Sequence, residues 1–160
     1  VRRLAARLAR RRGAGVVHEI DGHAVDDAVG GEAVAHADLV LCRDQLHRVD
    51  DPVALLHRVV AAAEGRPIVL STPDRAVVDP DRPLGPPTDP RHRRTWSLDQ
   101  LELLLLSCGL DVERWWRVPS RPGSGRYRRL AAASATLPRP GVIRDELVVL
   151  ATSRGTARAT

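Results

Sequence analysis

Residues 37–44 read Ala-Asp-Leu-Val-Leu-Cys-Arg-Asp, and residues 67–73 read Pro-Ile-Val-Leu-Ser-Thr-Pro. Continuous apolar runs of this length are typical of strands buried on both faces of a parallel sheet, so we expect strands over 37–41 and 67–70. Between them, Asp51 and Pro52 predict the start of a helix, with the aspartate as cap and the proline in the first turn. The apolar stripe of this helix continues to about Glu64. The region therefore predicts a strand–helix–strand unit.

The rest of the chain extends this alternation of helices and strands. A helix is expected over 2–12, and strands are expected over 16–20, 112–118 and 147–151. Ser97 and Gln100 fit a capping box for a further helix that Gly109 ends. Alternating helices and buried strands predict an α/β fold with a mostly parallel sheet. No helix separates the last two strands, so they are expected to form an antiparallel pair.

Length and composition exclude several classes of protein. The chain has 160 residues, which suits one domain, and no apolar run approaches the ~20 residues of a membrane-spanning helix. Two cysteines form no disulfide framework and no zinc ligand set, and the six histidines lack metal-site spacing. We therefore expect a cytoplasmic chain without a metal site or a membrane anchor.

Charge is divided unevenly along the chain. All 25 basic residues are arginine; residues 1–13 hold six of them and no acid, and residues 114–160 hold ten against two acids. Residues 14–113 hold nine arginines against 18 acids. The arginine-rich ends raise the alternative of a nucleic-acid-binding protein, but the acidic middle and the single tyrosine disfavour it.

An ordered set of motifs over about residues 14–152 resembles the class I S-adenosylmethionine (SAM)-dependent methyltransferases. The set begins with 38–44 (DLVLCRD), 49–52 (VDDP) and 68–75 (IVLSTPDR), and it continues with 85–87 (GPP) and 92–96 (HRRTW). The resemblance implies a Rossmann-like sheet with an antiparallel C-terminal strand pair. It also implies SAM as cofactor and a small-molecule or sugar-type methyl acceptor.

The sequence departs from this family at its N-terminal side. The glycine-rich turn that follows the first strand in the family is missing. The distance along the chain from Asp21 to the strand that begins near Asp38 suits residues 16–20 as the family's third strand rather than its second. The first strand would lie beside the Asp38 strand, so the sheet is expected to be incomplete there. We therefore expect a single truncated domain over 1–152 and a disordered tail over 153–160, with a partner chain as one means of completing the sheet.

The resemblance also assigns roles to particular residues. Cofactor binding is expected at the ends of two strands and just beyond the second, at Asp21, Cys42, Asp44 and His47. His92 is the candidate catalytic base, since it follows a strand end in a long loop. Arg94 is expected to bind a carboxylate or phosphate of the substrate, and Trp96 to line the substrate pocket.

Three functions stay open at this point. The first is a SAM-dependent methyltransferase homologue acting on a small molecule or a sugar-type acceptor, and the missing glycine-rich turn argues against activity of the isolated chain. The second is a non-catalytic, methyltransferase-like remnant that binds a partner, suggested by the changed motif residues His47-Arg48 and Arg93. The third is the arginine-rich nucleic-acid binder.

Overall fold

A computed structural model describes residues 1–13, 15–20, 37–81, 86–118 and 145–154. Along the chain, its elements are α1 (Arg2–Arg11), β1 (Val17–Ile20), β2 (Leu39–Arg43), α4 (Pro52–Ala63), β3 (Ile68–Pro73), α5 (Arg75–Val78), α6 (Leu98–Ser107), β4 (Leu110–Val118) and β5 (Glu146–Ser153). The predicted alternation of helices and strands is confirmed, and α5 is a short helix in a segment that was expected to be loop.

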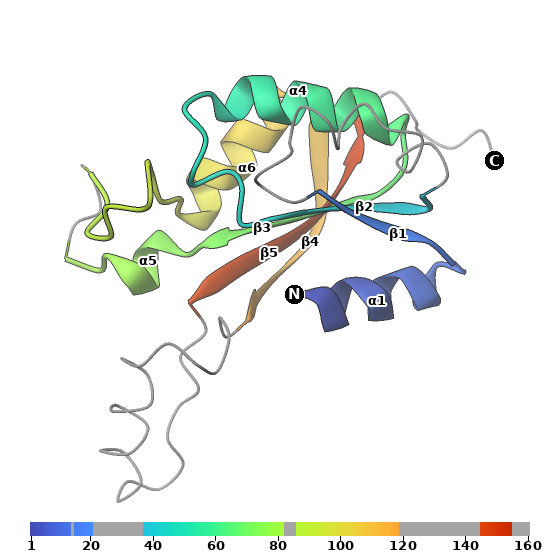
Figure 1. Cartoon of the computed structure of the whole chain (residues 1–160), viewed down its shortest axis with the longest axis horizontal. Coiled ribbons are helices and arrows are strands. Elements are labelled where there is room, and N and C mark those ends of the chain that lie inside the picture. The colour runs from blue at the N-terminus through green and yellow to red at the C-terminus, as the bar shows by residue number, and fades with distance from the viewer. Residues whose placement is uncertain (14, 21–36, 82–85, 119–144, 155–160) are drawn as a thin grey trace, which may run out of the picture.

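The strands form one sheet in the order β1-β2-β3-β5-β4 (Figure 1). β1, β2 and β3 are parallel to one another. β5 is antiparallel to both of its neighbours, so it inserts between β3 and β4. The prediction of a mostly parallel sheet closed by an antiparallel C-terminal strand pair is therefore confirmed. β4 lies at the edge of the sheet, and the later strand β5 fills the position between β3 and β4.

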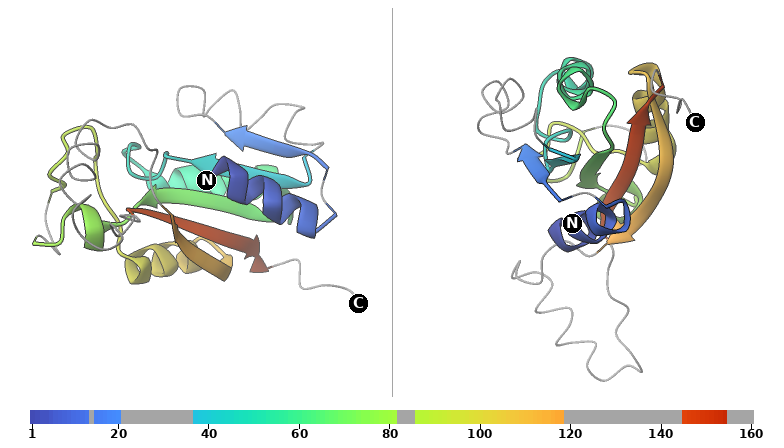
Figure 2. Two further views of the ribbon diagram at one scale, coloured as in Figure 1. Left: turned by 90° about the horizontal axis from the view of Figure 1, so that it is seen from below. Right: turned by 90° about the vertical axis from the view of Figure 1, so that its right-hand side faces the viewer.

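Helices cover both faces of the sheet. α4 and α6 lie on one face and α1 lies on the other (Figures 1 and 2). Alternate strand residues divide accordingly: Val40, Cys42 and Leu70 belong to the core under α4 and α6, whereas Leu41 and Val69 belong to the core under α1. Period-two alternation of side chains thus gives every central strand two buried faces.

Local chemistry starts the helices where the sequence predicts. Asp51 accepts a hydrogen bond from the Ala54 amide at 2.9 Å at the start of α4. Ser97 and Gln100 form the reciprocal bonds of the capping box at the start of α6. Gly109 follows α6 with a φ of +77°, which glycine adopts without strain. No helix in the described residues is long and apolar enough to cross a membrane.

The position of β1 corrects the interpretation of residues 16–20 as the third strand of the family. β1 pairs directly with β2, from Val17 opposite Leu39 to Ile20 opposite Cys42. The Asp38 carboxylate fixes this pairing, because it accepts the Gly15 and Val16 amides at 2.8 and 2.9 Å. β1 therefore occupies the place that the resemblance assigns to the first strand.

This pairing also locates where the sheet is incomplete. The described strands run from β1 to β4 without an interruption, and β1 pairs with β2 alone among them, so the sheet is incomplete beyond β1 and not beside the Asp38 strand. At the C-terminal side, β5 extends to Ser153, and Arg154 pairs with Asp111 at 2.8 Å. The first two residues of the predicted tail are thus ordered against the sheet, and residues 155–160 lie outside the described part of the chain.

We predict that Asp38→Ala weakens the attachment of β1. The substitution removes the acceptor of two backbone amides, and the hydrogen bonds of these amides also lower the pKa of Asp38 below its ordinary value. Amide hydrogen exchange should become faster in residues 17–20 and stay unchanged in residues 68–73. Asp111→Ala, which removes an exposed side-chain ion pair on β4, is the matched control. Unchanged exchange in residues 17–20 would contradict this account of the β1–β2 pairing.

Candidate functional site

The candidate site lies where the parallel strands end. In open α/β sheets, ligands bind in the crevice outside the carboxyl ends of the strands. Arg43 ends β2 and is paired with Ser71 of β3, and Asp44 follows it. β5 runs in the opposite direction, so its first residue, Glu146, lies at the same edge opposite Pro73. Side chains from three strands therefore meet at one edge of the sheet.

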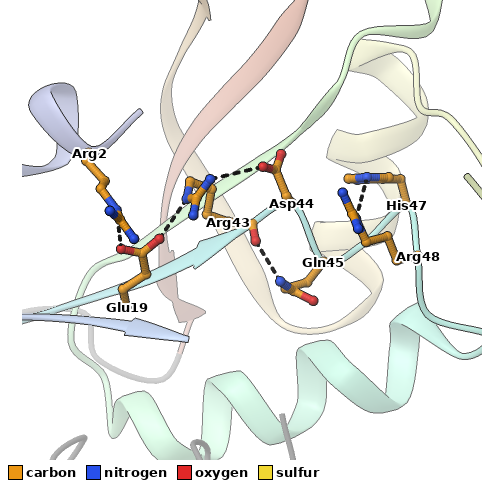
Figure 3. Close-up of polar contacts among 7 residues, drawn as sticks. All are labelled: Arg2, Glu19, Arg43, Asp44, Gln45, His47 and Arg48. Carbon is orange, nitrogen blue, oxygen red and sulfur yellow. Dashed lines mark hydrogen bonds and ion pairs between the residues drawn. The ribbon is translucent and has the colours of Figure 1, made fainter. Parts of the chain in front are cut away.

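A ladder of ion pairs joins α1, β1 and β2 at this edge (Figure 3). Glu19 accepts hydrogen bonds from Arg2 and Arg43, both at 2.6 Å. Arg43 also contacts Asp44 at 3.2 Å. Partial burial would raise the pKa of Glu19, but the two guanidinium groups outweigh it and lower that pKa. Glu19 is therefore ionised, and its ion pair with Arg2 attaches α1 to β1.

Asp44 keeps a side open to ligand. Its side chain is 36% exposed, and its φ of 56° lies in the left-handed region, which aspartate tolerates better than most residues. The left-handed turn ends β2 and leads directly into the segment that carries His47. Asp44 is thus a carboxylate at the strand ends that pairs with Arg43, lies against Glu146 and keeps an exposed face.

Glu146 is the buried acid of the site. It is 7% exposed, and its Oε1 atom has no hydrogen-bond partner among the described residues. Ser71 is 1% exposed, and its hydroxyl also lacks a partner of regular geometry. Burial raises the pKa of Glu146 to about 7, and the Asp44 charge adds to this, whereas the Ser71 hydroxyl opposes it. A buried carboxyl that titrates near neutrality is typical of functional sites.

We predict that Glu146→Gln removes a pH-dependent loss of stability. The pKa of Glu146 is about 7 in the folded chain against 4.5 as its ordinary value, so the folded state holds the proton more tightly. Its stabilising contribution is complete below pH 4.5 and is lost as the pH rises through about 7. Relative to the wild type, E146Q should gain about 1–3 kcal/mol in free energy of unfolding between pH 4 and pH 8. Urea titrations measure this, with Glu102→Gln on α6 as control. An equal pH dependence in both variants would contradict it.

Two histidines form the other part of the site. His47 is 1% exposed and lies 4.4 Å from His92, centroid to centroid, with the rings nearly perpendicular. The loop that carries His92 is held here because the His47 carbonyl accepts the Arg93 amide at 2.7 Å. The prediction placed both residues near the strand ends, and the structure brings them into direct contact.

Burial keeps both imidazoles neutral. It lowers the pKa of His47 to about 3, with further contributions from His92 and Arg48. Burial and the nearby arginines also lower the pKa of His92 and outweigh the opposing charge of Asp89. Nε2 of His47 accepts from Arg48 Nε at 3.2 Å, which assigns the proton of the neutral ring to Nδ1. Nδ1 has no partner among the described residues.

We predict that His47 contributes an acid-induced loss of stability. The unfolded chain protonates His47 below about pH 6.5, whereas the folded chain resists protonation down to about pH 3. The contribution of His47 is therefore complete above pH 6.5 and is lost as the pH falls toward 3, by at most about 1.4 kcal/mol per pH unit. His47→Gln should flatten the pH dependence of the free energy of unfolding, and His57→Gln on the exposed side of α4 should not. Parallel slopes for wild type and His47→Gln would contradict this.

Arg94 and Trp96 lie together beside these histidines. Both line an open pocket of about 480 Å³, whose wall also includes Arg75, Arg93 and Gln100. The Arg94 guanidinium lies 5.9 Å from the centre of the Trp96 ring. Trp96 also packs against the core cluster that contains Leu101. The structure thus places the two predicted substrate-binding residues in one pocket.

The side chain of Cys42 does not face the site. Cys42 is 1% exposed and its side chain belongs to the core under α4 and α6. Burial, with the charge of Asp44, raises the pKa of its thiol to about 12. Any contact between Cys42 and a ligand would therefore involve its backbone. Asp21 lies outside the described residues.

Sequence reasoning missed Glu146, Ser71 and Glu19. Ser71 stands in the quoted Ser-Thr-Pro motif, and Glu146 directly precedes the apolar run 147–151. An antiparallel last strand begins at the edge where the parallel strands end. That topology was the available signal for placing Glu146 beside Ser71.

Comparison with solved structures identifies the fold. The chain superimposes on the 1,6-didemethyltoxoflavin-N1-methyltransferase of Burkholderia thailandensis with a TM-score of 0.53, over 95% of this chain and 77% of that chain at 15% identity. A SAM-dependent methyltransferase from Mesorhizobium loti gives 0.42 at 21% identity, covering 72% of this chain and 61% of that chain. The magnesium protoporphyrin IX methyltransferase of Synechocystis gives 0.45 at 15% identity, covering 73% and 45%. This chain thus spans about half of the length of the last two.

No protein-family model matches the sequence, and no curated protein matches it significantly. The likeness to solved structures is one of fold at these levels of identity. The fold is the Rossmann-like α/β fold of the class I SAM-dependent methyltransferases, which confirms the fold that the sequence resemblance implied.

Proposed function

We propose that this chain binds SAM at the carboxyl ends of its parallel strands and transfers the methyl group to a small-molecule acceptor. The observation that carries this proposal is the strand pairing at one edge of the sheet. The parallel pairing of β2 with β3 brings Asp44 and Ser71 to the edge where this fold binds ligands, and antiparallel β5 adds Glu146 there. The Burkholderia enzyme of the same fold was solved with S-adenosylhomocysteine and 1,6-didemethyltoxoflavin bound, which supports the choice of cofactor and acceptor class.

The polar groups at this edge fit such a cofactor. SAM carries an ammonium group and a sulfonium, and bound SAM supplies an electrophilic methyl carbon. The exposed face of the Asp44 carboxylate is suited to a cation. The ion pair of Arg43 with Glu19 joins β2 to β1 next to Asp44, and Arg43 also contacts the Asp44 carboxylate. Buried Ser71 Oγ and Glu146 Oε1, which make no hydrogen bond of regular geometry among the described residues, offer hydrogen-bonding capacity that a polar ligand or water would use. Cys42 and His47 would contribute through the backbone of the same segment.

His92 is the group proposed to accept the proton of the acceptor. Its ring is neutral at pH 7 because burial lowers its pKa, so a nitrogen lone pair is available as a base. His47 packs against one side of the His92 ring and limits its rotation. The rest of the rate enhancement would come from holding the nucleophile in line with the methyl group. A non-catalytic, partner-binding remnant is the competing function, and cofactor binding distinguishes the two.

We predict micromolar binding of S-adenosylhomocysteine in calorimetric titration of the folded chain. Asp44→Asn should weaken binding at least tenfold, or about 1.4 kcal/mol, since it removes the charge and keeps a residue that tolerates the left-handed backbone. His92→Ala should keep the affinity and lose methyl transfer. Asp111→Asn is the control. A folded chain that does not bind S-adenosylhomocysteine would overturn the proposed function in favour of the partner-binding remnant.

A further inference from the structure

We infer that the pocket of Arg75, Arg93, Arg94 and Trp96 binds an oxyanion, and that the methyl acceptor carries a carboxylate or phosphate group there. The identification of the ligand as the acceptor rests on the proposed function. The pocket itself is a feature of the fold, since its wall comes from α5, from the segment before α6 and from α6. It lies at the carboxyl end of β3, because Arg75 begins the helix that follows this strand.

The wall of the pocket is positively charged. It contains three arginines, Thr95, Trp96, Gln100 and Leu103, and no acidic residue. Of the acids around it, Asp74 is fully buried against Arg117 at 2.6 Å, and Asp79, which bonds to Thr88 and Thr95, lies close enough for its charge to act on Arg75. The Asp50 carboxylate pairs with Arg93, so Arg94 is the arginine of the wall that no nearby acid pairs with among the described residues. Arginine matches the planar and tetrahedral geometry of carboxylate and phosphate groups. The charge of the wall therefore selects an anionic group over a neutral or cationic one.

Protein contacts hold Arg94 in position and leave most of its guanidinium N–H donors available. Its Nη2 donates to the Asp50 carbonyl at 2.7 Å, and its guanidinium lies over the Trp96 ring at 5.9 Å. The backbone around it is fixed because Arg93 donates its amide to the His47 carbonyl. The one hydrogen bond uses one of five guanidinium donors, so a fork of N–H groups stays available for a ligand.

Trp96 contributes part of the pocket wall and a signal that reports on it. Its indole nitrogen Nε1 is buried and has no hydrogen-bond acceptor among the described residues. Because the pocket is open and this nitrogen is buried, the arginines carry the expected contacts with the anion, and the indole N–H signal reports binding beside it. The apolar face of Trp96 and Leu103 would then contact the body of the ligand.

Asp50 competes with the ligand for one of these cations. Its carboxylate lies 3.4 Å from Arg93 Nε, and its side chain is 85% exposed. An exposed ion pair of this kind is weak, so a ligand oxyanion can replace it. Removing the Asp50 charge should therefore strengthen anion binding while the Asp50 carbonyl continues to hold Arg94.

The test uses benzoate and inorganic phosphate as probes, at constant ionic strength, in nuclear magnetic resonance titrations of the indole N–H signals. The three tryptophans give three signals, and Trp96→Phe identifies the one that belongs to the pocket. We expect a saturable shift of the Trp96 signal alone. Binding of benzoate but not phosphate indicates a carboxylate acceptor, and the reverse indicates a phosphorylated one. Neutral benzyl alcohol should produce no saturable shift.

Variants separate the pocket from general electrostatic attraction. Arg94→Gln should weaken binding at least tenfold, and Asp50→Asn should strengthen it several-fold, an outcome that unfolding cannot imitate. Arg91→Gln is the matched control, because Arg91 lies in the same loop, pairs with Asp89 and is 78% exposed. Equal losses in Arg91→Gln and Arg94→Gln, or the absence of saturable binding by folded wild type, would overturn the inference.

A parallel titration with S-adenosylhomocysteine keeps the two proposals apart. Arg94→Gln should leave the affinity for S-adenosylhomocysteine unchanged. Anion binding without S-adenosylhomocysteine binding would overturn the proposed function and keep the pocket. S-adenosylhomocysteine binding without anion binding would overturn the pocket alone.

Discussion

The site depends on the parallel pairing of β2 with β3. The register sets Cys42 beside Leu70 and Arg43, the last residue of β2, beside Ser71, so both strands end at the same edge of the sheet, β3 at Pro73. Asp44 and His47 follow one strand, and Asp74 and Arg75 follow the other. Because β5 pairs antiparallel with β3, its first residue, Glu146, enters the sheet opposite Pro73 at that edge as well. A shift of this register by one residue would exchange the two faces and bury the wrong side chains.

Electrostatics divides this edge into two parts. On the α1 side, Glu19 and Arg43 neutralise each other, and Glu146 lies buried with its pKa raised to about 7. On the α6 side, arginines dominate, and the neutral pair His47 and His92 lies next to them. Burying unpartnered polar atoms such as Glu146 Oε1 opposes folding. Proteins retain such groups mainly where function requires them, which agrees with a ligand site between the two parts.

The sequence allowed much of the fold to be predicted, where local chemistry determined it. Asp51 and the Ser97–Gln100 pair start helices through contacts three residues apart, so these helices were correctly placed. The position of β1 could not be derived in this way. It depends on the Asp38 carboxylate reaching the Gly15 and Val16 amides 23 and 22 residues away, and spacing alone suggested a different strand.

The site shows the same division between local and long-range information. His47, His92, Arg94 and Trp96, which the sequence proposed as site residues, follow β2 and β3 in the chain; the two histidines are in contact, and Arg94 and Trp96 line one pocket. Glu146 was missed because it approaches Asp44 only after β5 inserts beside β3. Asp50 was missed because its contacts with Arg93 and Arg94 depend on the fold of the loop.

Hydrogen exchange measured with and without S-adenosylhomocysteine tests most directly whether the strand ends form the ligand site. The account predicts slower exchange in residues 43–48 and 71–75 when S-adenosylhomocysteine is present, with no change in residues 53–63 of α4. Protection confined to α1 or to the outer face of α6, with residues 43–48 unaffected, would show that the ligand binds elsewhere and would contradict the account.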